Sequence, residues 1–179
     1  MLNLGSGLMI GERAPDFDLS GVDGKRYSLA SFDHKQILVV IFTGNGCPTA
    51  RAHEDTMKAI QENYSVKGVQ LLAINSNNSS LSPPDSFSEM IKKARDKSFN
   101  FPYLKDLDRR VAREYGAICT PHVFIFDELR TLRYKGRIDD SRDPSRVITR
   151  DLQNALDDLI AGRNVRVSET NPFGCSVVW

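Results

Sequence analysis

The chain has three cysteines, and Cys47 stands in the sequence setting best suited to covalent chemistry. It follows the apolar run 37–42, which is rich in β-branched residues, and the turn 44–46, and it directly precedes Pro48. The run predicts a buried strand, and a proline after such a turn is typical of the first turn of a helix. The sulfur should therefore lie where free backbone N–H groups and the helix dipole favour a thiolate. Because the thiolate is the reactive form, we predict that Cys47 is a nucleophile.

A buried cysteine that only fills space in the core is the alternative interpretation of Cys47, and such cysteines are common. A space-filling residue does not require Pro48 beside it, nor the glycines Gly44 and Gly46 that hold the turn open. The pattern therefore favours a reactive thiol.

Length and composition favour one globular domain, because 179 residues of which 40% are hydrophobic can bury a substantial core. The formal net charge of +1 gives no reason to expect a nucleic-acid or membrane partner, and no apolar run reaches membrane-spanning length. The first ten residues lack the basic start of a secretory signal, and the cysteines are too few and too far apart for a disulfide framework. We expect a cytoplasmic protein, with a mature exported chain as the alternative.

Apolar periodicity and turn residues predict strands that alternate with helices. Strands are expected at 37–42, 69–74, 122–126 and 131–135, with an extended piece at 101–104 and a hairpin around the turn 21–24. Helices are expected from Pro48 to about 67, from Asp85 to about 98, from Asp108 to 115, and from about Pro144 to 161. This order predicts an α/β fold with a central mixed sheet, helices on both faces and an N-terminal β-hairpin extension. In such sheets sites form beyond the carboxyl ends of strands, where Cys47 and the polar loop 75–84 both lie.

Three features of the sequence occur together: the cysteine between a strand and a proline-started helix, the pair Thr120-Pro121 before the strand 122–126, and the segment Gly-Glu-Arg-Ala-Pro-Asp-Phe-Asp-Leu at 11–19. Together they resemble the thioredoxin-like superfamily, and in particular the redoxin group. That group is related to the alkyl-hydroperoxide-reductase/thiol-specific-antioxidant (AhpC/TSA) proteins and to the cytochrome-maturation thioredoxins. The resemblance covers roughly residues 10–160. It implies a single thioredoxin-like domain over 1–179, with 163–179 as a C-terminal tail that docks on it.

The resemblance assigns roles to residues around the cysteine. In this superfamily the proline that matches Pro121 is cis and packs beside the reactive sulfur, and a cis bond is accessible at low cost only before proline. The backbone before it can pair with a bound peptide as an added strand. Thr120 and Pro121, with Pro48 and Thr49 next to the cysteine, are therefore the expected substrate-binding residues.

The chain also departs from its relatives. The second cysteine of a thioredoxin C-x-x-C motif is matched by Ala50, the buried acid by Ile41, and the tryptophan before the first cysteine by Gly46. A peroxiredoxin has a threonine three residues before its cysteine and a proline seven before, where this chain has Gly44 and Val40. The peroxidase residues therefore do not carry over one by one.

An oxidised Cys47 needs a second thiol to resolve it. Cys119 lies two residues before Pro121, so it shares the neighbourhood of the reactive sulfur if that proline does, and it is the first choice. Cys175 is the second choice, because it lies in the tail, a segment that is mobile by default. The apolar end of this tail nevertheless favours docking.

We therefore predict a thiol-dependent oxidoreductase with antioxidant activity, in which Cys47 attacks a disulfide or a peroxide and Cys119 or Cys175 resolves the product. A thioredoxin- or glutathione-type reductant would restore it, without a cofactor and without a metal. The alternatives are a thioredoxin-like binding module of weak activity and, less favoured, a copper carrier that uses His122 with two cysteines. His34 and His53 are expected at the surface.

Overall fold

The computed structural model describes residues 7–179 of the chain. Its strands are β1 (Leu19–Gly21), β2 (Arg26–Tyr27), β3 (Ile37–Thr43), β4 (Val69–Asn75), β5 (Tyr103–Lys105), β6 (Cys119–Thr120), β7 (His122–Phe126), β8 (Leu132–Gly136) and β9 (Cys175–Ser176). Its α-helices are α1 (Pro48–Ala52), α2 (Glu54–Ser65), α3 (Phe87–Asp96), α4 (Arg110–Tyr115) and α5 (Asp151–Ile160). Short 3-10 turns lie at Leu29–Phe32, Pro83–Asp85 and Pro144–Arg146.

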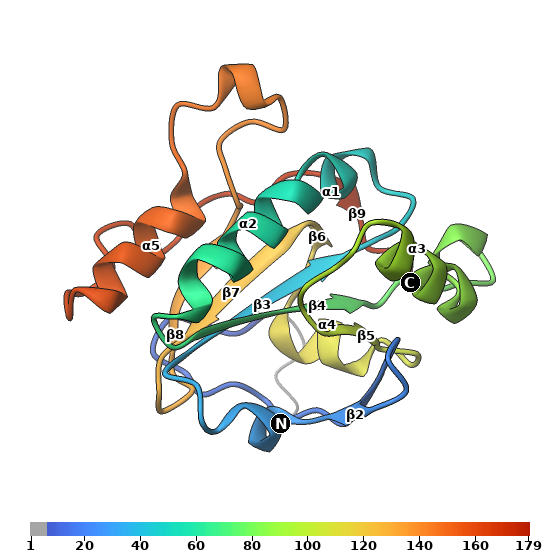
Figure 1. Cartoon of the computed structure of the whole chain (residues 1–179), viewed down its shortest axis with the longest axis horizontal. Coiled ribbons are helices and arrows are strands. Elements are labelled where there is room, and N and C mark those ends of the chain that lie inside the picture. The colour runs from blue at the N-terminus through green and yellow to red at the C-terminus, as the bar shows by residue number, and fades with distance from the viewer. Residues whose placement is uncertain (1–6) are drawn as a thin grey trace.

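The strands form one large mixed sheet and a small separate one (Figure 1). The seven-stranded sheet has the order β2-β1-β5-β4-β3-β7-β8, with β3, β4 and β5 parallel and the outer strands antiparallel. The N-terminal hairpin β1–β2 extends the sheet beyond β5. The second sheet pairs β6 with β9, which brings the tail to the segment before Pro121. The predicted α/β class, mixed sheet and hairpin extension are confirmed.

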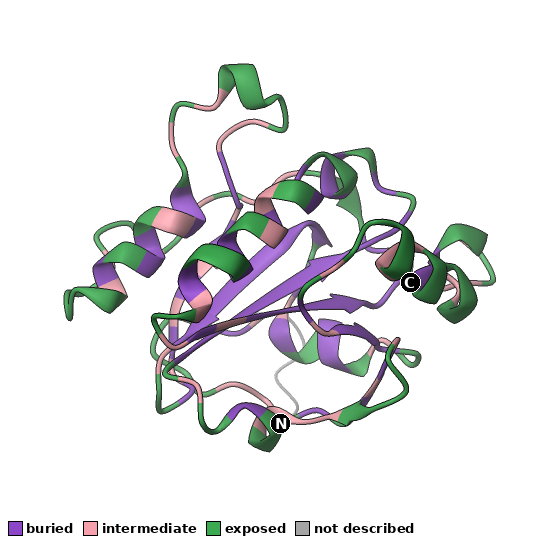
Figure 2. Ribbon diagram, in the orientation of Figure 1, coloured by how far each residue is buried: buried purple, intermediate pink, exposed green. Residues whose placement is uncertain are grey.

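Helices cover both faces of the large sheet, and each covered face carries its own apolar core. One core joins α2, α3 and α5 to alternate residues of β3, β4 and β7, and the other joins α4 and the N-terminal segment to the remaining residues of those strands. The central strands are therefore buried on both sides, as Figure 2 shows in purple. This explains why the 37–42 run reads as continuously apolar instead of alternating. Among residues 7–179, no helix is both long enough and apolar enough to span a membrane.

Two helices differ from their predicted extents. The helix that begins at Pro48 is interrupted at His53, where α1 ends and α2 begins. The segment predicted as a helix from Pro144 forms only a short 3-10 turn followed by an extended stretch, and α5 begins at Asp151. Val147 and Ile148 are thus outside the helix, and Ile148 is 85% exposed. Without an apolar surface to pack against, their apolar periodicity was not enough to fix a helix.

The start of α4 is held by a different carboxylate from the predicted one. Asp106, which is fully buried, accepts hydrogen bonds from the N–H groups of Val111 (3.3 Å) and Ala112 (2.9 Å) and from the Ser76 hydroxyl (2.7 Å). Asp108, the predicted cap, is exposed and accepts from Arg110 N–H (3.1 Å). Because Ser76 begins the loop after β4, Asp106 ties α4 to the edge of the sheet where Cys47 lies. The prediction for the α3 cap was also wrong, since Ser86 takes the place assigned to Asp85.

We expect Asp106→Ala to lower the free energy of unfolding by about 3 kcal/mol, because it leaves buried N–H and hydroxyl donors without an acceptor. Asp108→Ala should cost about 1 kcal/mol or less, because its donor can turn to water. Urea unfolding of both variants measures the difference. Equal losses would contradict the assignment of Asp106 as the cap that holds α4.

Candidate active site

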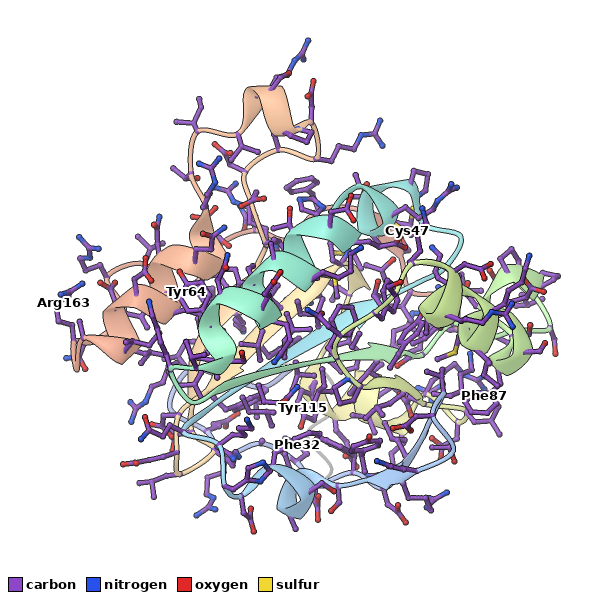
Figure 3. The ribbon with its side chains drawn as sticks, viewed as in Figure 1. Phe32, Cys47, Tyr64, Phe87, Tyr115 and Arg163 are labelled. Carbon is purple, nitrogen blue, oxygen red and sulfur yellow. The ribbon has the colours of Figure 1, made fainter. Side chains whose placement is uncertain are left out.

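Cys47 lies between the end of β3 and the start of α1, at the position labelled in Figure 3. Its backbone is extended and it is the N-cap residue of α1, whose Ala50 N–H points at the sulfur (3.4 Å). Ala50, at the place of the second cysteine of a C-x-x-C motif, is fully buried. The predicted placement of the sulfur at a helix start is therefore what the structure has. The sulfur is covered, however, because Cys47 is only 4% exposed.

The segment before Pro121 supplies the next contacts of the sulfur. The Thr120–Pro121 peptide bond is cis, as the resemblance implies. The Cys47 thiol donates a hydrogen bond to the backbone oxygen of Thr120 at 3.0 Å. The buried Thr120 hydroxyl has no other hydrogen-bond partner within residues 7–179, so it is available to donate to a thiolate.

The three cysteines differ in how readily they ionise. Burial alone would raise the pKa of Cys47, but hydrogen bonds from Thr120, Ala50 and Cys175 outweigh it and leave its pKa below the ordinary value. The hydrogen bond to Cys47, together with burial, raises the pKa of Cys175 to about 11. Burial and the charges of the other two sulfurs raise the pKa of Cys119 to about 11. Cys47 is therefore the cysteine of this cluster that ionises first.

The two candidate partners of Cys47 lie on adjacent strands. In the pairing of β6 with β9, Thr120 stands opposite Cys175, and Cys119 stands opposite Ser176. Cys175 is exposed, and through its thiol and backbone N–H it contributes to the lowered pKa of Cys47. Cys119 is buried, and its thiol points at Pro121 O (3.8 Å); the charge of Cys47 helps to raise the pKa of Cys119, but no hydrogen bond joins the two residues. The geometry thus favours Cys175 over Cys119, the reverse of the order in which the sequence placed them.

A buried polar network beneath the 44–46 turn was not predicted. The Asp85 carboxylate, 1% exposed, accepts from the backbone N–H of Asn45 at 2.6 Å. The Asn45 side chain donates to Pro84 O (2.8 Å) and accepts from the hydroxyl of the fully buried Tyr103 (2.8 Å). Lys93, which is paired with Glu54, also reaches Asn45 O (3.3 Å). Asn45 therefore holds the 44–46 turn in place, and this turn holds Cys47 in place.

The Asp85 carboxylate is held by three further donors. They are Asn75 Nδ2 (2.8 Å), Asn77 Nδ2 (3.1 Å) and Ser82 Oγ (2.5 Å). Burial alone would raise the pKa of Asp85, but these hydrogen bonds and that of Asn45 bring it below its ordinary value. Gly44 belongs to the same arrangement, because a Cβ there would overlap the Asn77 amide. The sequence signal for this network is the polar loop 75–84, which follows a buried strand. That this loop packs against the 44–46 turn can be seen only in the fold.

The predicted substrate-binding residues divide into two groups. Pro48 and Thr49 line a cavity of about 520 Å³ together with Arg142, Phe173 and Cys175. Thr120 and Pro121 instead face the tail: Thr120 pairs with Cys175 in the small sheet. An open cavity thus lies beside the start of α1, which Cys47 caps, and the strand edge beside Pro121 is occupied by the tail.

The histidines do not all lie where they were predicted. His34 is exposed as expected, but His53 is 3% exposed, so its surface assignment is wrong. Its Nδ1 bonds to Thr49 O (2.9 Å) where α1 ends, which explains its burial.

Burial and the charge of Lys135 lower the pKa of His122 to about 4, and its Nδ1 accepts from Ile118 N–H (3.4 Å). Within residues 7–179, no three His, Cys, Asp or Glu side chains are arranged to hold a metal ion.

The mixed sheet, the helix-capping cysteine and the cis proline beside it define a protein of the thioredoxin-like class. Solved structures with this fold include the thioredoxin domain of a thiol-disulfide oxidoreductase from Bacteroides vulgatus (TM-score 0.62, 18% identity, covering 72% of this chain and 89% of that one). Another is peroxidoxin BcpB from Mycobacterium tuberculosis (TM-score 0.60, 17% identity, 70% and 83%). At these identities the likeness concerns the fold alone.

The chain belongs to the AhpC/TSA family, whose model matches residues 10–135. It is similar over nearly its whole length to a hypothetical protein from Sinorhizobium meliloti 1021 (TM-score 0.91, 32% identity, 97% of this chain and 96% of that one). A conserved protein from Geobacillus kaustophilus is equally similar (TM-score 0.90, 35%, 96% and 92%). Thiol-disulfide oxidoreductase ResA of Bacillus thuringiensis subsp. konkukian is 24% identical over 119 residues, which are 66% of this chain and 64% of ResA. The chain therefore spans less than two thirds of the length of this relative.

We expect Thr120→Val to raise the pKa of Cys47 and to slow its alkylation at pH 7 several-fold, because it removes the hydroxyl that donates to the thiolate while keeping the backbone oxygen. The measurement is the rate of Cys47 alkylation by iodoacetamide from pH 5 to pH 10, with peptide mapping. Thr131→Val is the control and should leave the profile in place, because Thr131 precedes β8 at the end of the sheet away from Cys47. Identical profiles for wild type and Thr120→Val would show that the hydroxyl does not act on the sulfur.

We expect Asp85→Asn to lower the free energy of unfolding by about 2–3 kcal/mol at pH 7, because an amide cannot accept from all the donors of the network. The folded state holds the pKa of Asp85 below its ordinary 3.8. Its contribution is therefore present above that value and is lost as the pH falls through the folded pKa. The difference between wild type and variant should stay constant at neutral pH and shrink below about pH 4.

Urea unfolding at a series of pH values measures this difference. Asp96→Asn is the control, since Asp96 is exposed and pairs with Arg95 at the surface. It should change stability little at any pH. A difference between wild type and Asp85→Asn that is as large at pH 3 as at pH 7 would exclude an ionised Asp85 as the centre of the network.

Proposed function

We propose that this protein is a thiol-dependent oxidoreductase in which Cys47 is the nucleophile and Cys175 resolves the oxidised form. The observation that carries the proposal is the pairing of β9 with β6, which places Cys175 opposite Thr120, the residue whose backbone oxygen accepts from the Cys47 thiol. The pKa of Cys47 is lowered, while Cys175, hydrogen-bonded to it, keeps its proton with a pKa of about 11. Cys47 can therefore attack the oxidant as a thiolate, and Cys175 can then attack the oxidised Cys47 sulfur.

The relatives support thiol redox chemistry in general. The AhpC/TSA family match covers β1 to β8, including both Cys47 and Pro121. The curated relative ResA is a thiol-disulfide oxidoreductase, and the structural neighbour BcpB is a peroxidoxin. These names represent the two reactions that the sequence analysis left open.

In the first step the Cys47 thiolate attacks its oxidant. With a hydroperoxide, the sulfur takes the terminal oxygen, the O–O bond breaks, and the leaving alkoxide or hydroxide takes up a proton, which leaves a sulfenic acid. With a disulfide, the sulfur displaces one thiolate and forms a mixed disulfide. The peroxide route oxidises the Cys47 sulfur by two electrons, whereas the disulfide route shares the two oxidising equivalents of the substrate between Cys47 and the retained substrate sulfur. Neither route needs a second cysteine in the α1 turn.

In the second step Cys175 attacks the oxidised Cys47 sulfur. Its thiolate displaces water from the sulfenic acid, after proton uptake, or displaces the substrate thiol from the mixed disulfide, and a Cys47–Cys175 disulfide forms. The hydrogen bond to Cys47 is the largest cause of the raised pKa of Cys175. Once Cys47 is oxidised its thiolate is gone, so Cys175 ionises more readily at the point where it is needed.

A dithiol of the thioredoxin type, or two molecules of a glutathione-type thiol, would return the enzyme to its starting state. Cys175 is the exposed sulfur of the disulfide and Cys47 the buried one. An external thiolate therefore attacks Cys175 and releases Cys47, which is also the better leaving group because its pKa is the lower of the two.

The proposal predicts different outcomes for the three cysteines. Cys47→Ser should abolish the consumption of hydrogen peroxide and of a small disulfide, because the nucleophile is gone. Cys175→Ser should leave the first turnover but reduce steady-state turnover by about tenfold or more, because oxidised Cys47 is no longer resolved. Cys119→Ser should change turnover by no more than about twofold, since its sulfur takes no part. Stopped-flow single-turnover and steady-state assays separate these outcomes.

Intact mass and peptide mapping after one equivalent of oxidant provide the control. The wild type should lose two hydrogens and yield a linked Cys47–Cys175 peptide pair. A Cys47–Cys119 pair would reverse the assignment of the resolving residue. A Cys47 that is alkylated no faster than a model thiol would refute the proposal and leave a peptide-binding module without turnover.

A further inference from the structure

The strand edge beside the cis proline is occupied by the chain itself. Residues 174–178, here called the docking strand, run antiparallel to β6, with Cys175 opposite Thr120 and Ser176 opposite Cys119. Val177 N–H continues the ladder to Ile118 O (3.5 Å). This is the edge at which the backbone before Pro121 was expected to pair with an added strand.

The docking strand is held on its other side as well. Asn78 N–H donates to Val178 O (2.7 Å), and Val178 N–H donates to Asn77 Oδ1 (2.9 Å). Val177 is 4% exposed, so its side chain is buried in the same groove. The strand is therefore bonded along both edges, between β6 and the loop after β4, and it covers the Cys47 sulfur. Figure 1 shows β9 between these segments, next to α1.

Glycine at position 174 is a requirement of this docking. Its φ is +149°, in the region that favours glycine, and a Cβ there would overlap the Thr120 carbonyl oxygen. Thr120 O is also the acceptor for the Cys47 thiol. The chain thus passes the reactive sulfur at a distance that only a residue without a side chain permits.

We infer that the docking strand selects the oxidant of Cys47: while it is docked, Cys47 reacts with small oxidants of the size of a hydroperoxide and not with disulfides of partner proteins. The inference rests on the proposed function, because it assumes that Cys47 is a nucleophile. A polypeptide disulfide needs the strand edge beside Pro121, and that edge is taken. A small molecule needs no strand pairing, and the cavity lined by Pro48, Thr49 and Arg142 lies beside the start of α1, which Cys47 caps.

The chemistry of the small oxidant follows from the same geometry. The hydroperoxide loses its O–O bond to the Cys47 thiolate, and the sulfenic acid that forms lies against Cys175 on the docking strand. Cys175, which the pairing with β6 holds opposite Thr120, then displaces water from the sulfenic acid and closes the disulfide. The docking strand therefore both excludes the large substrate and resolves the product of the small one.

Gly174→Ala tests the inference, because the added methyl group drives the docking strand away from Thr120 and keeps all three cysteines. The readout is the rate of Cys47 alkylation by iodoacetamide and by a polyethylene-glycol maleimide, each scored by peptide mapping. In the wild type the bulky reagent should react far more slowly than the small one. In Gly174→Ala the ratio of the bulky-reagent rate to the iodoacetamide rate should rise about tenfold or more, because losing the tail's effect on the pKa of Cys47 changes both rates alike whereas the opened strand edge admits the bulky reagent.

Gly162→Ala is the matched control, since Gly162 also has a positive φ but a Cβ there meets open space. It should behave as the wild type with both reagents. Val177→Asp is a second way to displace the strand, by placing a charge in the buried groove, and it keeps the test valid if Gly174→Ala folds poorly. Both displaced variants should also gain reduction of insulin disulfides, which the wild type should lack.

Two results would overturn the inference. One is a wild-type Cys47 that reacts with the bulky reagent as fast as the displaced variants do. The other is an equal rise for both reagents, which would mean that the substitution only loosens the site. Failure of the proposed function is recognised separately, by a Cys47 that neither consumes hydrogen peroxide nor reacts with iodoacetamide faster than a model thiol in any variant.

Discussion

A buried thiol can ionise only if the protein supplies the hydrogen bonds that water would otherwise give, and this constraint governs the site. Cys47 is 4% exposed, and burial alone would hold its proton in place. Donors from three distant parts of the chain reverse that tendency: the first turn of α1, the segment before Pro121, and the tail. The fold brings these donors to the Cys47 sulfur, because the end of β3, the cis-proline segment and β9 meet at the same edge of the sheet.

The constraint also explains why the turn before Cys47 is held so firmly. A hydrogen bond of 3.0–3.4 Å to a sulfur is lost if the turn moves by a small amount. Asn45 is anchored by Asp85, Pro84 and Tyr103, and these anchors are themselves buried or bonded. Together with the helix ends they form a rigid support for Cys47, and rigid support of this kind is what functional sites generally require.

The strands and the position of Cys47 at a helix start were predictable from sequence, because continuous apolar runs and the glycine and proline residues around a turn are local signals. The run 37–42 is β3, 122–126 is β7, and the helix start at Pro48 is present. What failed depends on distant contacts. His53 was predicted at the surface because the break between α1 and α2, where it is buried, is not visible in the sequence. The last helix was predicted from Pro144, but α5 begins at Asp151, because only the residues from there on pack against the sheet. Cys119 was preferred over Cys175 because it lies only two residues from Pro121 along the chain. The pairing of β6 with β9 instead places Cys175 opposite Thr120, beside Cys47. Likewise, nothing local links Asp85 to Asn45, forty residues earlier.

The network around Asp85 has a consequence for the history of the sequence. Its members satisfy one another, so a change at one leaves donors or acceptors of the others without partners inside the protein. Accepted substitutions at Asn45, Asn75, Asn77, Asp85 and Tyr103 should therefore be correlated among homologues, with the set exchanged together or retained together. Residues 140–142, which line the cavity beside α1, lie outside this network, so they can change without breaking its hydrogen bonds and can evolve at a different rate.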